Sequence, residues 1–115
     1  MVTALHRIVA EASTWPGVVI ARGSEGETLL RVGRCEIGHL HDDGVAHFAF
    51  PTGLWLGLIE DGHVEPHPLE RAGLAERRIR TEADVADVIA LLRLNYDRIA
   101  MHAGLRPALA AAGSA

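Results

Sequence analysis

The sequence predicts an α+β fold, in which a long C-terminal helix covers a short antiparallel meander of four to five strands. Shorter helices are expected at the N-terminus and after the fourth strand. Four short segments rich in β-branched and apolar residues follow one another between residues 18 and 50, separated by turn residues. The longest helical periodicity comes later, after residue 81. Grouped strands with helices at the ends favour α+β over alternating α/β.

The composition is typical of a small globular domain. The chain has 115 residues, of which 49% are hydrophobic and 23% are charged. We expect a single domain over residues 1–104, followed by an alanine-rich, frayed tail over residues 105–115. The net charge of -4 argues against general nucleic-acid binding, which needs a positive surface.

The expected location is cytoplasmic. The chain opens with no basic-then-apolar leader, and no apolar run approaches the roughly 20 residues of a membrane span. The single cysteine, Cys35, has no partner for an intramolecular disulfide. We therefore expect no membrane partner. The sequence identifies no cofactor, leaves the small-molecule or protein partner unknown and leaves homo-oligomerisation open.

The first third of the chain predicts a helix and two strands. Over residues 3–13, apolar residues recur at i, i+3, i+4 and i+7, which places them on one helical stripe. Pro16 ends this helix because proline disfavours helix at the preceding residue. Residues 18–22 and 28–32 are β-branched or apolar and flank a Gly-Ser-Glu-Gly turn.

Two tight loops then define the third and fourth strands, residues 35–41 and 45–50. Gly33-Arg34 suits a two-residue type II′ loop, and Asp42-Asp43-Gly44 suits a three-residue loop. The first loop pairs Arg31 with Glu36 and, continuing the ladder, Leu30 with Ile37. An opposite-charge pair across the strands supports this register.

The second loop places three histidines on one face of the predicted sheet. It sets His41 opposite Val45 and His39 opposite His47, and side chains alternate along each strand. In this register Cys35 and Ile37 share the histidine face. Gly38 indicates either a bulge that exchanges the two faces or the close approach of another backbone. The sequence leaves these alternatives open.

The second half predicts a helix, an edge strand and the long final helix. Pro51 opens the first helix and Gly62 ends it. Gly53 and Gly57 lie four residues apart in it and predict a close contact, because glycine otherwise weakens a helix. An arginine-rich strand over residues 75–80 would lie at a sheet edge.

The final helix has both a start signal and a buried stripe. Thr81 and Asp84 resemble a capping box. Its predicted apolar stripe extends for more than four turns. The stripe contains Val85, Val88, Ile89, Leu92, Tyr96 and Ile99.

Several short motifs resemble the small bacterial and fungal luciferase-domain proteins. They are the run GRCEIGHLH, an F-A-F-P strand end, an E-P-H segment and a last helix ending L-L-R-L-N-Y, and together they cover about residues 17–98. The most specific motifs are Gly38-His39-Leu40-His41, Glu65-Pro66-His67 and Leu94-Asn95-Tyr96. The resemblance implies a small α+β domain with a YjbR-like order of elements. It implies no activity, and no cofactor motif points to light emission.

The histidines are the strongest candidates for a functional site. His39, His41 and His47 on one face, with His67 on a following loop, could bind a divalent metal through neutral imidazoles. A polar ligand pocket formed by His39, His41, His67 and Tyr96 is the leading interpretation, in a non-catalytic binding or interaction module. A small metal- or histidine-dependent enzyme is the alternative.

Three further groups are weaker candidates. Asp42, Asp43 and Glu65 could orient an imidazole for acid–base chemistry, although Asp-Asp-Gly also serves as turn chemistry. Cys35 is about 13 Å from His39 along an extended strand, too far for an activated nucleophile unless the strand bulges. Five arginines near the last strand and helix could instead form an anion or nucleic-acid site. The expected interpretation is that these arginines are solvated and paired with carboxylates. This group contains Arg77, Arg78, Arg80, Arg93 and Arg98.

Overall fold

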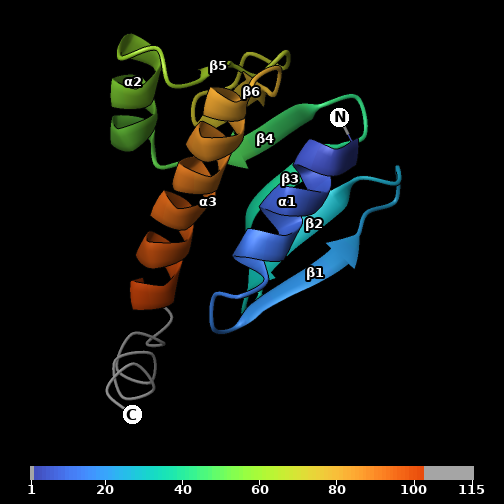
Figure 1. Cartoon of the computed structure of the whole chain (residues 1–115). Helices are drawn as coiled ribbons and strands as arrows, with labels where there is room; N and C mark the ends of the chain where they lie inside the picture. The colour runs from blue at the N-terminus through green and yellow to red at the C-terminus, as the bar shows by residue number, and fades with distance from the viewer. Residues whose placement is uncertain (1, 103–115) are drawn as a thin grey trace.

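The structure, a computed structural model, describes residues 2–102 (Figure 1). Its helices are α1 (Val2–Ala12), α2 (Thr52–Glu60) and α3 (Glu82–His102). Its strands are β1 (Val18–Arg22), β2 (Thr28–Val32), β3 (Cys35–His41), β4 (Val45–Ala49), β5 (Glu65–Pro66) and β6 (Leu74–Arg78). The strands form one antiparallel sheet in the order β1-β2-β3-β4-β6-β5, which confirms the α+β class.

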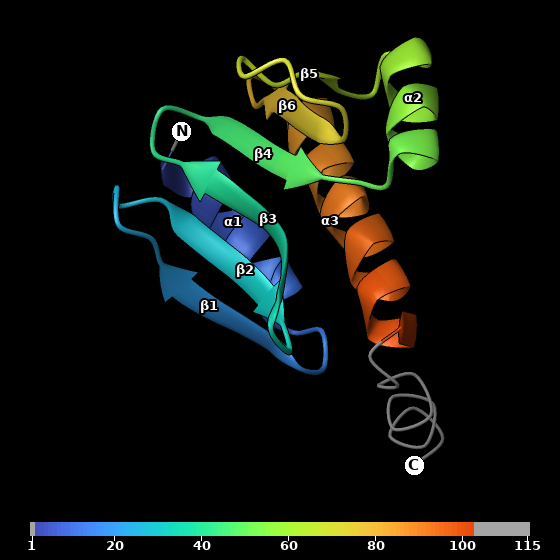
Figure 2. The same cartoon turned by 180° about the vertical axis from the view of Figure 1, so that it is seen from behind.

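The helices α1 and α3 lie on the same face of the sheet. Figure 1 shows them in front of the strands, and Figure 2 shows the strands from behind, with no described helix over their outer face. The described residues share one hydrophobic core between the sheet and these helices. The predicted tail, residues 105–115, lies outside the described residues. None of the helices within residues 2–102 is long and apolar enough to span a lipid bilayer.

The two predicted hairpin loops are confirmed. Val32 pairs with Cys35 across Gly33-Arg34, and His41 pairs with Val45 across the second loop. Gly33 has φ of 61° and Gly44 has φ of 86°, the left-handed conformation for which glycine was expected.

A bulge in β3 makes part of the predicted register wrong. Arg31 pairs with Glu36 as expected, but Leu30 pairs with Gly38, so Ile37 is the extra residue. Ile37 is fully buried and does not lie on the histidine face, contrary to the predicted register. Glu36 shares that face with His39 instead. An extra residue shifts the alternation of side chains by one position. Of the two alternatives for Gly38, the adjacent bulge is therefore confirmed.

Gly38 is also a point of close packing. A Cβ atom at this position would lie 2.7 Å from Leu92 Cδ2 and 3.1 Å from Phe48 Cδ1. One of the two predicted alternatives was the close approach of another backbone, but the atoms nearest to Gly38 belong to the side chains of Leu92 and Phe48. Glycine therefore lets α3 pack directly onto β3.

The helix α3 fixes the bulge from the core side. Thr81 Oγ1 accepts a hydrogen bond from the Asp84 amide, and Asp84 accepts one from the Thr81 amide, which confirms the capping box. Asn95 is fully buried, and its Nδ2 donates to the carbonyls of Ile37 and Ala49 at 3.1 and 3.0 Å. Asn95 thus ties the bulged residue to the end of β4.

The arginine-rich segment forms a strand, but its predicted edge position is wrong. The strand β6 pairs with β4 on one side and with the two-residue β5 on the other. Arg77 projects toward α3, where it contacts Asp84 and Asp87, both at 2.7 Å. These ion pairs balance the charge of Arg77 in a strand that lies between β4 and β5.

The close contact predicted at Gly53 and Gly57 is wrong. Cβ atoms at these positions would have no neighbour within 4 Å. The helix α2 has no fully buried residue. A hydrogen bond from Trp55 Nε1 to the Leu74 carbonyl, at 2.9 Å, connects it to the start of β6.

Candidate functional site

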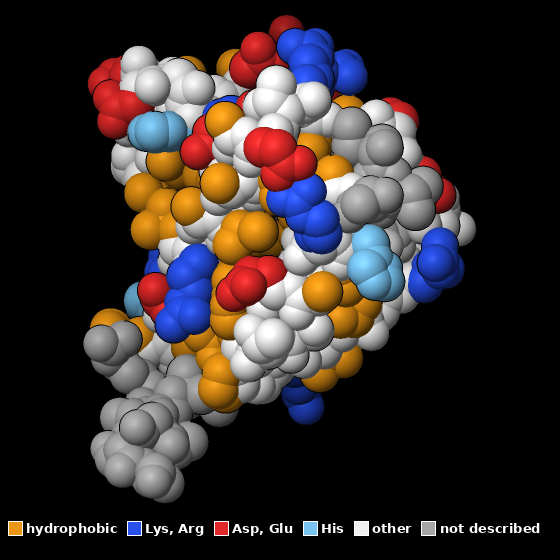
Figure 3. All heavy atoms as spheres, in the orientation of Figure 1, with side chains coloured by type: hydrophobic (Ala, Val, Ile, Leu, Met, Phe, Trp, Pro, Cys, Tyr) orange, Lys and Arg blue, Asp and Glu red, His pale blue; other side chains and the backbone are white. Residues whose placement is uncertain are grey.

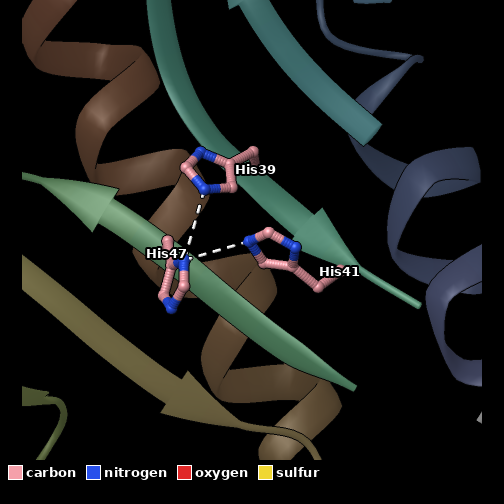
Figure 4. A group of neighbouring side chains, drawn as sticks. All are labelled: His39, His41 and His47. Atoms are coloured by element: carbon pink, nitrogen blue, oxygen red, sulfur yellow. Dashed lines mark hydrogen bonds between the residues drawn. The ribbon is translucent and has the colours of Figure 1, made fainter. Parts of the chain in front are cut away.

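The structure brings three of the predicted histidines together on the uncovered face of the sheet. His39 and His47 lie directly opposite each other on β3 and β4, and His41 follows His39 by two residues. His47 Nδ1 lies 3.1 Å from His41 Nε2 and 3.2 Å from His39 Nε2 (Figure 4). One nitrogen from each ring lies within 4.8 Å of the others. The three rings therefore gather one nitrogen each in a small region of this face.

Two carboxylates contact the outer nitrogens of this histidine group. His39 Nδ1 donates to Glu36 at 2.8 Å, and His47 Nε2 donates to Glu76 at 3.0 Å. The second pair is well shielded, since the side chains of His47 and Glu76 are 14% and 13% exposed. The expected orienting residues were Asp42, Asp43 and Glu65, but Glu36 and Glu76 make the contacts.

The carboxylates determine which ring nitrogens carry protons. A carboxylate only accepts hydrogen bonds, so neutral His39 carries its proton on Nδ1 and neutral His47 carries its proton on Nε2. Their remaining nitrogens, 3.2 Å apart, then both present lone pairs. Two facing lone pairs repel each other unless a proton or a metal cation lies between them. A shared proton or a bound cation would each relieve this repulsion.

The two imidazoles differ in their affinity for a proton. The hydrogen bond to Glu36 raises the pKa of His39. Burial lowers the pKa of His47, although its contact with Glu76 acts in the opposite direction. A proton shared between these rings therefore resides on His39.

His67 lies beside the group, whereas Tyr96 does not. The His67 ring, on the loop after β5, has its centroid 4.3 Å from that of His47. Tyr96 is buried on the core side, where its hydroxyl donates to the Pro16 carbonyl and its ring packs 5.5 Å from Trp15. The structure therefore separates Tyr96 from the histidines with which it was grouped.

The sequence model described as Luciferase domain matches residues 34–95, more than half of the chain. This chain belongs to the luciferase-domain family. The matched segment contains all three facing histidines, both carboxylates and His67. No curated protein and no solved structure matched this chain.

Three of the five arginines in the predicted group of this luciferase-domain chain make contacts within the protein. Arg77 contacts two aspartates, and Arg93 Nε donates to Asp97 at 3.0 Å, the carboxylate expected from its i,i+4 spacing. Arg98 donates to Asn95 Oδ1. In Figure 3, which views the helix-covered side, several basic side chains lie beside acidic ones. These contacts favour a structural role for Arg77, Arg93 and Arg98.

Glu36 and Glu76 were missed by sequence reasoning for different reasons. Glu36 reaches the histidine face only because of the bulge, for which Gly38 was the available signal. Glu76 lies opposite His47 through the pairing of β4 with β6, and α2 and β5 separate these strands along the chain. A tight loop specifies register locally, but this longer connection does not.

Proposed function

We propose that this luciferase-domain protein binds a divalent transition metal through His39 Nε2, His41 Nε2 and His47 Nδ1. The observation that carries the proposal is the convergence of three ring nitrogens, two of them on rings whose opposite nitrogen is held by a carboxylate. Such carboxylate–histidine contacts orient metal ligands and increase their basicity.

Two of the three nitrogen separations agree with a tetrahedral ion, and the nitrogens of all three rings lie within 4.8 Å of one another. Zn–N bonds of about 2.0–2.1 Å place two tetrahedral ligands about 3.3 Å apart. The separations of 3.1 and 3.2 Å around His47 Nδ1 are close to this value. Hydrogen bonds have similar lengths, but His47 Nδ1 has a single lone pair and cannot accept well from both neighbours. A cation satisfies all three nitrogens at once.

The ligand set indicates the class of metal. Imidazole nitrogens suit Zn²⁺, Cu²⁺, Ni²⁺ and Fe²⁺, whereas Ca²⁺ and Mg²⁺ prefer oxygen. Three protein ligands leave a further coordination position, as catalytic zinc sites do. The position would open on the outer face of the sheet, which no helix within residues 2–102 covers. This arrangement supports the alternative of a small metal-dependent enzyme over a purely structural metal site.

The expected histidine-lined ligand pocket has less support. Three hollows, of about 260, 450 and 300 Å³, are lined by other parts of the described chain, and of the two site carboxylates only Glu76 borders one of them. Small-molecule sites are generally concave and bury most of their ligand. A metal needs only the nitrogens that already converge.

Metal binding tests the proposal directly. Protein purified without a polyhistidine tag is titrated with Zn²⁺ by calorimetry, alongside His47→Ala, His39→Ala/His41→Ala and the control His63→Ala. His63 is an exposed histidine outside the group. We expect one Zn²⁺ per wild-type and control chain, and at least a tenfold loss in the site variants, because each loses ligands.

Circular dichroism of the same variants separates binding from folding. The site histidines lie outside the core, so the double variant should keep its secondary structure while it loses the metal. Equal Zn²⁺ affinity in wild type and His47→Ala would contradict the proposal. Unfolding of the double variant would instead assign these histidines to the stability of the sheet.

A further inference from the structure

His67 is held beside the three histidines by its own loop. Its backbone amide donates to the Leu74 carbonyl at 3.2 Å, and its carbonyl accepts from the Glu70 amide at 2.7 Å. The Leu69 amide donates to His67 Nδ1 at 3.0 Å. The ring is therefore fixed from both the backbone and the side chain, with its centroid 4.3 Å from the His47 ring.

The contact with Leu69 determines the tautomer of His67. An amide N–H can only donate, so Nδ1 must present its lone pair, and neutral His67 carries its proton on Nε2. Nδ1 is thus occupied, and Nε2–H is a hydrogen-bond donor. Within residues 2–102, His67 is not part of the group of three facing nitrogens, and its Nε2 has no hydrogen-bond acceptor. The structure thus provides a donor next to a metal ligand without adding a fourth ligand.

We propose that His67 recognises a singly charged oxyanion, such as a carboxylate, bound at the open position of the metal. This inference rests on the proposed metal site. The three ligands of the proposed site are neutral imidazoles, so an anionic oxygen at the open position would be the one negatively charged group bound directly to the ion, and it can also accept the Nε2–H bond. Glu36 and Glu76 surround the site with negative charge, which disfavours a multiply charged anion such as phosphate.

The test uses the full chain loaded with Co²⁺, whose visible absorption reports changes in coordination, and acetate as the anion. His67→Asn is the decisive variant, because its Oδ1 can still accept from the Leu69 amide while the distant Nε2–H donor is lost. His63→Ala is the matched control. A hydrogen bond to a charged group is worth enough to change affinity by about tenfold or more.

We expect His67→Asn to bind Co²⁺ as wild type does and to bind acetate about tenfold more weakly, with the control unchanged. Phosphate should perturb the wild-type spectrum less than acetate at equal concentration. Unchanged acetate affinity in His67→Asn, or no acetate response in wild type, overturns the inference and leaves the metal site standing. A large loss of Co²⁺ affinity in His67→Asn also overturns it, since His67 would then be a ligand. Failure of wild type to bind Co²⁺ overturns the metal proposal itself.

Discussion

Replacing Asn95 by leucine should destabilise the protein because one amide group supports both the bulge and the end of β4. The two side chains are similar in volume, so the change mainly removes hydrogen bonds. The Ile37 carbonyl loses its partner within the core, while the contact to Ala49 is only partly buried. An unsatisfied buried acceptor costs about 1–3 kcal/mol and a partly solvated one less, so we expect a total loss of about 2–4 kcal/mol.

Urea unfolding followed by circular dichroism measures this loss. With an m-value of about 1.5 kcal/mol/M, the midpoint should fall by roughly 1.3–2.7 M. Asp97→Asn, on the exposed side of the same helix, is the control and should change stability by less than about 0.5 kcal/mol. A loss below about 1 kcal/mol for Asn95→Leu would refute the idea that Asn95 holds the bulge.

Three further changes test the packing and the helix start. Gly38→Ala should cost about 1–3 kcal/mol in urea unfolding through its clash with Leu92, and Leu92→Ala should lessen this cost in the double variant. The Arg77 contact lowers the pKa of Asp84 to about 2, so its stabilisation is complete above about pH 4 and is lost as the pH falls toward 2. Asp84→Asn should lose about 1 kcal/mol at pH 7 and show a flatter acid dependence, and an unchanged acid curve would contradict this assignment. Tyr96→Phe should cost about 1 kcal/mol in thermal or urea unfolding, because the Pro16 carbonyl loses its donor, and a neutral result would exclude that bond as a net contributor.

The part of the site that the sequence predicted is the part that local turn chemistry specifies. Asp42-Asp43-Gly44 sets the register between β3 and β4, and alternation then places His39, His41 and His47 on one face. The position of His67 beside His47 depends on where β5 adds to the sheet. The sequence placed His67 only on a following loop and did not specify its position relative to His47.

The remaining features depend on contacts between distant parts of the chain. Tyr96 was assigned to the histidine pocket, but its partner Pro16 lies 80 residues away in sequence, on the opposite side of the sheet. The bulge was one of two interpretations of Gly38, and the pairing of Leu30 with Gly38 identifies it. Helical periodicity identifies a buried stripe but does not show which strand that stripe contacts.

The bulge connects the core side of the sheet to the face that carries the histidines. With regular pairing, Ile37 would stand on the open face beside His39, and Glu36 would point toward α3. The extra residue buries Ile37 and turns Glu36 outward, where it holds His39 Nδ1. Asn95 stabilises this arrangement from the core, 58 residues away in sequence. If the proposed metal site exists, a substitution at Asn95 should weaken Zn²⁺ binding in the calorimetric titration, because Glu36 would no longer be held in contact with His39.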